Sequence, residues 1–170
     1  MLKILGVFML LCGGAGIGTL QVQQMNKRIK TLRSLICALE IMERELSFRM
    51  PLLEEMIFTA GRSSEEPTKS FLLMCGNELK NNPDNLFYEI WDRAAQEHLT
   101  SLEKGDFEPV SVLGSVLGRY DDDAQRKAIM QAHGTLTKEL TIAQEERCSR
   151  GKVCKALGTT VGAFLAILLL

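Results

Sequence analysis

The chain has 170 residues, of which 24% are charged, and a formal net charge of −1 at pH 7. Five cysteines without a C-x-x-C pair argue against a disulfide framework, and two isolated histidines argue against a zinc site. The length suits one domain with a modest core rather than two.

An uncharged apolar segment opens the chain and extends over residues 4–26. Because a helix of about 20 apolar residues spans a bilayer, residues 1–22 are predicted to form an N-terminal transmembrane helix. A cleaved secretory leader is the alternative, since Ala15 and Gly18 could imitate the small residues of a cleavage site. The glycines do not fit a phosphate-binding loop, because no lysine follows them before Lys27.

A second uncharged apolar segment, residues 156–170, closes the chain and is predicted to form a C-terminal transmembrane helix. With only fifteen residues, it spans the bilayer if Lys155 reaches outward to the interface or the bilayer thins locally. Each segment has two glycines four residues apart: Gly14 and Gly18, and Gly158 and Gly162. This spacing allows close packing of membrane helices, but glycine is also common in such helices, so both explanations stay open.

Basic residues flank both apolar segments on their inner sides. They are Lys27, Arg28, Lys30 and Arg33 after the first segment, and Arg147, Arg150, Lys152 and Lys155 before the second. Positive residues close to membrane segments stay on the cytoplasmic side. Residues 23–155 are therefore predicted to form a cytoplasmic domain, with both termini outside the cytoplasm and the basic flanks at the lipid headgroups. A cleaved leader would place the domain on the opposite side.

The central region has helical periodicity. Apolar residues three and four apart, from Leu32 to Leu46, predict one buried face on a long first helix without a break before Met50. Prolines suited to a first turn predict helices at about 51–60, 67–80 and 84–103. The predicted boundary residues are Asn82 as the cap of the third of these helices, and Gly61 and Gly105 as the ends of the first and third.

Two more helices complete the prediction. One is expected at about 107–118, beginning at Asp106, and the last runs from Asp122 into the C-terminal segment. No stretch alternates apolar and polar residues over the length of a strand. The predicted fold class is all-α, a cytoplasmic bundle of about six helices flanked by two transmembrane helices.

Acidic residues dominate the central region: residues 35–146 contain 21 acidic and 11 basic residues. Such a body repels nucleic acid and suits a partner with a basic face, although acidity also simply keeps a membrane-tethered domain soluble. No motif joins a nucleophile, a base and a group that stabilises developing charge. We therefore predict a protein that is not an enzyme and has no catalytic residue, cofactor or metal.

The stretch LGRYDDDAQRKAI, residues 117–129, has the most specific pattern in the chain. In the turn from Leu117 to Gln125, Gly118 is expected to end one helix, Asp121 to cap the next, and Gln125 to fasten the turn by a hydrogen bond. In this stretch, with weaker matches at Met50-Pro51-Leu52 and Trp91, the chain resembles the stage III sporulation protein AB family of endospore-forming bacteria. The resemblance covers nearly the whole chain.

The resemblance implies a helical bundle similar to the cytoplasmic domains of inner-membrane platform proteins in type II secretion and type IV pilus systems. It implies a location in the mother-cell membrane around the forespore. The implied partners are the secretion-type ATPase of the same sporulation stage, protein AA, and other components of the channel. The glycine spacing also allows a homo-oligomer, with packing on a neighbouring copy of the chain. The residues alone serve equally for a generic membrane-anchored helical scaffold, an exported helical protein with a C-terminal anchor, or a hydrolase with an unrecognised site.

Overall fold

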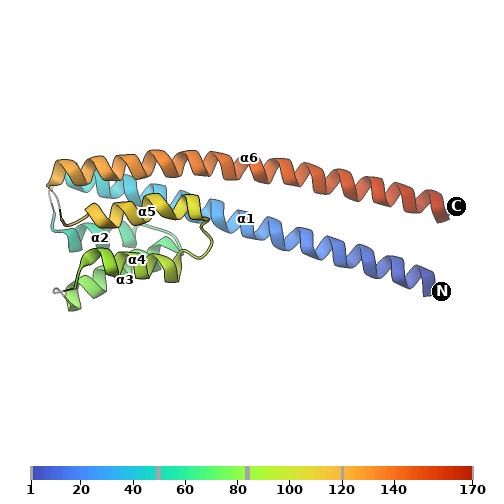
Figure 1. Ribbon diagram of the computed structural model, residues 1–170, viewed down its shortest axis with the longest axis horizontal. Helices are drawn as coiled ribbons and strands as arrows, with labels where there is room; N and C mark the ends of the chain where they lie inside the picture. The colour runs from blue at the N-terminus through green and yellow to red at the C-terminus, as the bar shows by residue number, and fades with distance from the viewer. Residues whose placement is uncertain (1, 49–50, 83–84, 120, 170) are drawn as a thin grey trace. The chain divides into compact units, whose positions relative to one another are not determined.

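The computed structural model consists of six α-helices joined by short connections (Figure 1). The helices are α1 (Leu2–Phe48), α2 (Leu53–Arg62), α3 (Thr68–Asn81), α4 (Phe87–His98), α5 (Lys104–Val116) and α6 (Asp122–Leu169). The structure describes the backbone except at residues 1, 49–50, 83–84, 120 and 170, and the side chains of residues 22–149 with the same internal gaps. No strand occurs in the described backbone, which confirms the all-α prediction.

The chain divides into two compact units. One comprises residues 28–141, and the other comprises residues 1–27 and 142–170, so both α1 and α6 contribute to each unit. The predicted transmembrane segments, 1–22 and 156–170, lie outside the residues whose side chains are described, apart from Val22. Among the residues that are described, no helix combines the length and the apolar character needed to cross a membrane.

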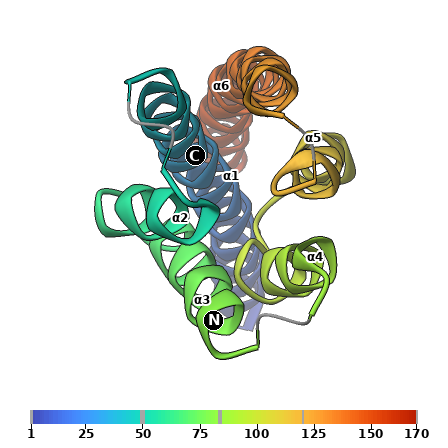
Figure 2. The ribbon, with the colours of Figure 1, turned by 90° about the vertical axis from the view of Figure 1, so that its left-hand side faces the viewer.

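In the unit of residues 28–141, the helices surround one apolar core in chain order (Figure 2). The short helices pack as successive neighbours, α2 on α3, α3 on α4 and α4 on α5. The predicted apolar face of α1 lies in this core, since Leu32, Leu39 and Met42 are at most 4% exposed. Burial of these side chains supplies the main driving force for folding.

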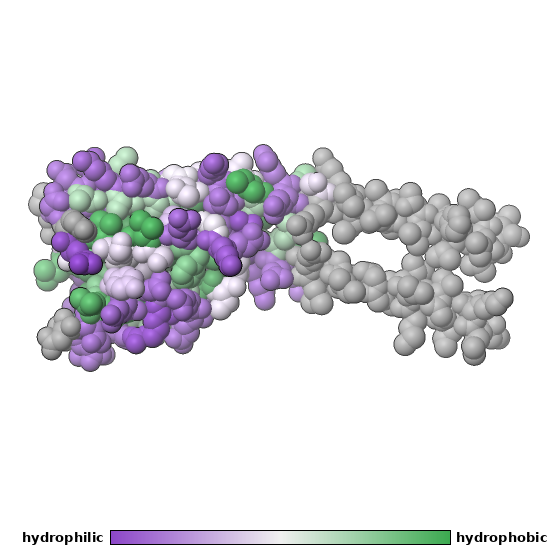
Figure 3. All heavy atoms as spheres, viewed as in Figure 1, coloured by the Kyte–Doolittle hydropathy of each residue, from purple (hydrophilic) through white to green (hydrophobic). Residues whose placement is uncertain are grey.

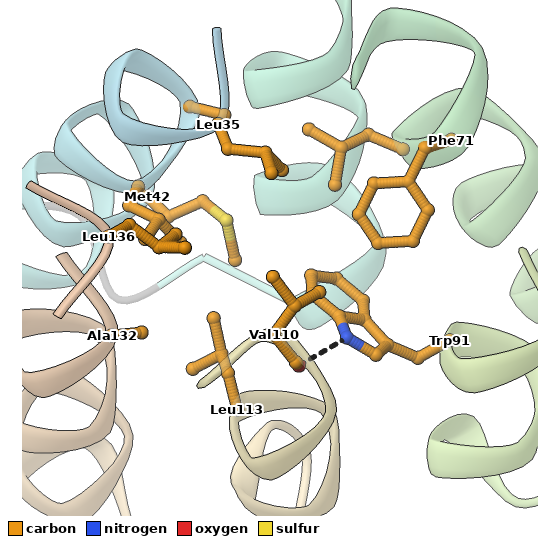
Figure 4. A pocket seen from close by; sticks show the side chains of 11 residues that line it. Leu35, Met42, Phe71, Trp91, Val110, Leu113, Ala132 and Leu136 are labelled. Carbon is orange, nitrogen blue, oxygen red and sulfur yellow. Dashed lines mark hydrogen bonds between the residues drawn. The ribbon is translucent and has the colours of Figure 1, made fainter. Parts of the chain in front are cut away.

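Trp91 of α4 is the largest fully buried side chain and joins α4 to α3 and α5. Its ring lies edge-on to Phe71, with centroids 4.7 Å apart, and its Nε1 donates a hydrogen bond of 2.8 Å to the Val110 carbonyl (Figure 4). A Cβ atom on Gly114 would lie 2.2 Å from Trp91 Cδ1, so only glycine lets the indole lie directly on the α5 backbone. The adjoining void of about 10 Å³ is lined by apolar side chains.

Several helix ends differ from the prediction. Helix α4 ends at His98 rather than near 103, and Asn82 is the C-cap of α3, whereas Leu86 occupies the N-cap position of α4. Gly61 lies inside α2, where a Cβ would be 3.1 Å from the Leu72 Cβ, so its small size serves helix packing. Local propensity favours the predicted ends, and packing between helices outweighs it at these residues.

The start of α5 also differs, because Gly105 lies in its first turn instead of ending the preceding helix. A capping box explains this: the Asp106 side chain accepts a 2.9 Å hydrogen bond from the Glu103 backbone N–H, and the Glu103 side chain accepts from the backbone N–H of Asp106. Helix α5 therefore begins at Lys104.

The cysteine of α3 gives a testable consequence of this core. Burial raises the pKa of the Cys75 thiol well above its ordinary value, with Glu78 acting in the same direction, whereas Cys37 is exposed. Because the thiolate is the reactive form, we expect iodoacetamide at pH 8 to modify Cys75 at least about tenfold more slowly than Cys37 in the folded chain. Peptide mass spectrometry after timed labelling measures both rates. Equal rates in the folded chain, or a slow Cys75 in urea, would contradict this account.

Candidate functional site

One side of α1 carries three buried polar residues at steps of three. Arg28, Thr31 and Ser34 are 6%, 1% and 7% exposed. Residues three apart are neighbours on a helix surface, so they form one row, which we call the α1 polar row. Buried polar groups are costly unless they are hydrogen-bonded, so the partners of this row show what it holds in place.

Arg28 holds the beginning of α5. Its Nε and Nη2 donate to the two carboxylate oxygens of Asp106 at 2.7 and 2.8 Å, and the Asp106 side chain is fully buried. Glu103 Oε2 forms an ion pair with Nη1 at 3.1 Å, and Glu139 of α6 accepts from Nη2 at 3.4 Å. The two-pronged pair with Asp106 fixes both distance and orientation. One guanidinium thus connects α1, α5 and α6.

The other two residues of the row hold the connections between the short helices. Thr31 Oγ1 and Ser101 Oγ, in the α4–α5 connection, share a 2.8 Å hydrogen bond. Ser34 Oγ donates to the Glu65 carbonyl at 3.0 Å and accepts from the Glu65 N–H at 3.2 Å, in the α2–α3 connection. The α1 polar row therefore attaches two connections and one helix start to a single helix.

The row was not recognised in the sequence, and Arg28 differs from its expected role. The sequence predicts Arg28 in the membrane-proximal positive flank, but its side chain lies inside the bundle because the Asp106 carboxylate binds it there. Lys27, Lys30, Arg33 and Arg147 are exposed, and Lys30 lies 3.4 Å from Glu65. Seven predicted residues lie where side chains are not described: Gly14, Gly18, Gly158, Gly162, Arg150, Lys152 and Lys155.

The turn between α5 and α6 contains the four predicted turn residues. Leu117 is fully buried, and Gly118 has φ +75°, the left-handed region that favours glycine. The Gly118 N–H donates to Gln125 Oε1 at 3.2 Å, and the Gln125 N–H donates to the Asp121 carbonyl at 3.0 Å. Asp121 directly precedes the first residue of α6. The turn thus reverses the chain between two packed helices.

The Gly118 conformation gives a stability prediction. Gly118→Ala should lower the free energy of unfolding by about 1–2 kcal/mol, because a Cβ is disfavoured at positive φ. A Cβ would also lie 2.7 Å from Leu53 Cδ2, which adds to the loss. Urea unfolding of the full chain in detergent measures the change.

Gly134 provides the matched control, because nothing lies within 4 Å of a Cβ at this position in α6. Gly134→Ala should raise the free energy of unfolding by up to about 1 kcal/mol through helix propensity. Effects of the same sign at both glycines would contradict the role assigned to Gly118.

In the described part of the chain, the remaining charged side chains do not form a recognisable catalytic or metal-binding arrangement. No group of three or more histidine, cysteine or acidic residues could hold a metal ion there. Glu66 has a lowered pKa chiefly because its carboxylate accepts a hydrogen bond from Ser70. His133 of α6 lies 3.3 Å from Glu40 of α1, and His98 lies 3.3 Å from the Met74 sulfur. The two histidine contacts join helices. The α1 polar row is therefore the main candidate site among the described residues.

Comparison with known proteins identifies the family. The sequence model of stage III sporulation protein AB matches residues 3–170. The chain belongs to this family. The stage III sporulation protein AB of Bacillus subtilis (strain 168) is 23% identical over 172 residues, and the alignment covers all of both chains.

A solved structure of a stage III sporulation protein AB has the same fold. It superposes with a TM-score of 0.65 and 19% identity, covering 72% of this chain and 98% of that chain. The resemblance drawn from residues 117–129 is therefore confirmed, and membership of the stage III sporulation protein AB family implies a role in sporulation.

Proposed function

We propose that the chain is a non-enzymatic membrane platform of the channel between mother cell and forespore. In this role it couples the cytosolic secretion-type ATPase of the same sporulation stage, protein AA, to the channel during endospore development. The bundle of residues 28–141 faces the cytoplasm of the mother cell, and the two apolar terminal segments cross the membrane around the forespore. Family membership and the all-helical fold support this proposal.

The attachment of α5 to α1 and α6 through Arg28 carries the proposal. Helices α1 and α6 are the ones that extend to Leu2 and Leu169, into the predicted membrane segments. A coupling protein must transmit movement from its bundle to the membrane helices, so the bundle must not deform when its partner moves. The buried two-pronged pair between Arg28 and Asp106 suits this task, because it resists both sliding and rotation of α5 against α1.

Charge supports a protein partner of opposite sign. The 21 acidic and 11 basic residues of the central region produce a negative field that steers a partner with a basic face. Exposed acidic residues occur on the bundle surface at Glu55, Asp121, Asp122 and Asp123. A membrane scaffold without an ATPase partner would have no need of this field beyond solubility.

Binding between the full chain in lipid nanodiscs and purified protein AA tests the proposal. We expect saturable binding that weakens by at least about tenfold between low and high salt, because screening reduces attraction between exposed charges. Empty nanodiscs measure binding to lipid alone. If a chain that is shown to be folded does not bind protein AA, the coupling to the ATPase is wrong. The chain would then be a membrane scaffold with other partners.

A further inference from the structure

Three large apolar side chains are exposed on α4, on α5 and at the residue before α4. Leu86, Tyr88 and Val112 are 60%, 43% and 56% exposed. Apolar atoms gather over α5 on the face turned to the viewer in Figure 3. Exposed apolar residues that occur singly are ordinary, but a group rimmed by polar residues marks an interaction site. We call Leu86, Tyr88 and Val112 the α4–α5 face.

Contacts between the two helices place these residues near one another. Ser111 Oγ donates to Asp92 Oδ1 at 3.0 Å, so these two residues lie opposite each other where α4 and α5 meet at the surface. Tyr88 is one helical turn before Asp92 and therefore shares its side of α4. Val112 follows Ser111 on α5, and Leu86 directly precedes α4. The three apolar side chains thus belong to the two helices that this hydrogen bond joins, or directly precede one of them.

The α4–α5 face is also rigid. Beneath it, the Trp91 indole donates to the Val110 carbonyl at 2.8 Å and lies against the Gly114 backbone. These contacts fix the spacing between the helices before any partner arrives. A surface that is already ordered loses less conformational entropy on binding, which favours affinity.

The charge around the α4–α5 face favours a basic partner. Residues 86–116 contain six acidic and two basic residues. Two of the acidic residues, Glu103 and Asp106, pair with Arg28, which leaves four acidic residues. One of the two bases, Arg93, pairs with Glu78. Exposed Glu89 adjoins Tyr88, and exposed Glu108 lies one helical turn before Val112. Two exposed carboxylates therefore lie close in the chain to Tyr88 and Val112.

We propose that the α4–α5 face binds a basic amphipathic helix of a partner protein. The apolar stripe of that helix covers Leu86, Tyr88 and Val112, and its lysine or arginine side chains pair with Glu89 and Glu108. An anionic lipid surface does not fit, because it would be repelled by these carboxylates. The inference goes beyond coupling to the ATPase and does not depend on it.

Photo-crosslinking of the full chain in lipid nanodiscs tests this proposal. The probe is a leucine–lysine helical peptide of about 18 residues, or five turns, that carries one benzoylphenylalanine. The matched peptide has glutamate in place of every lysine. Mass spectrometry locates the crosslinks on the chain. We expect the lysine peptide to crosslink to residues 86–92 and 108–116 at least about tenfold more than the glutamate peptide, because only its charge complements the two carboxylates.

Variants of the chain make the assignment specific. The double variant Tyr88→Ser/Val112→Ser should reduce crosslinking by at least about tenfold, because both residues are central anchors. Met130→Ser is the control, since Met130 of α6 is 54% exposed, and it should leave the yield unchanged. If the double variant has an altered melting temperature, Glu89→Lys/Glu108→Lys replaces it in the comparison and should show the same loss.

Three outcomes would overturn the proposal. The first is crosslinking outside α4 and α5, and the second is an equal yield with the glutamate peptide. The third is occupation by a second copy, which would appear as chain-to-chain crosslinks from benzoylphenylalanine placed at Val112 that excess lysine peptide does not displace.

Discussion

Arg28→Ala is expected to lower the free energy of unfolding by about 3–5 kcal/mol, because it leaves the carboxylate of Asp106 buried without its counter-charge. Asp106 is fully buried, so water cannot replace the guanidinium without opening the bundle. The loss should also weaken the attachment of α5 to α6 through Glu139. Urea unfolding of the full chain in detergent, followed by circular dichroism, measures the change.

Lys30→Ala is the matched control for this prediction. Lys30 lies two residues further along α1, and its exposed side chain is 3.4 Å from Glu65. Exposed pairs of this kind contribute about 0–1 kcal/mol, so the change in unfolding free energy should be small. A comparable loss for both variants would show that burial of Arg28 is not what makes it important.

The double variant Arg28→Met/Asp106→Leu separates stability from coupling. Apolar replacement of a buried ion pair is often neutral or stabilising, so most of the loss seen with Arg28→Ala should be recovered. The lost capping box should still cost about 1 kcal/mol. If the ion pair transmits movement, the double variant should fold and bind the ATPase but fail to support sporulation. Normal sporulation would remove the mechanical role.

Gly114→Ala is expected to cost about 3 kcal/mol, at the upper end of the range for overpacked cores. The new Cβ would lie 2.2 Å from Trp91 Cδ1 and 2.8 Å from Nε1. The indole cannot move aside easily, because it donates to the Val110 carbonyl and packs against Phe71 and Phe87. The midpoint of urea unfolding should fall accordingly.

A double-mutant cycle tests the cause of this loss. Trp91→Ala alone should cost about 3–5 kcal/mol through loss of the largest core side chain. In that background Gly114→Ala should become neutral or stabilising by up to about 1 kcal/mol, because the clash is gone and alanine favours the helix. Additive losses would mean that Gly114 is required for a reason other than the Trp91 contact.

The sequence by itself determined the helical character and the order of the helices. The spacing of apolar residues from Leu32 to Leu46 predicted the buried side of α1, because helix period is a local property. The turn at Gly118 is also predicted by the sequence, since its positive φ and its hydrogen bond to Gln125 involve residues close together in the chain. Helix ends at Gly61 and Gly105 were misjudged because packing and a capping box outweighed local preference there.

Only the tertiary structure decided the role of the polar residues. Arg28 and Asp106 are 78 positions apart, and Trp91 and Val110 are 19 apart, so neither pairing leaves a local pattern. In the sequence, Arg28 is one of four basic residues in the membrane-proximal flank. In the folded chain, α5 places the Asp106 carboxylate beside it. The one available signal was the step of three through Arg28, Thr31 and Ser34 next to the apolar stripe. A charged residue in such a row is buried only if the fold brings it a partner, which is a property of the whole bundle.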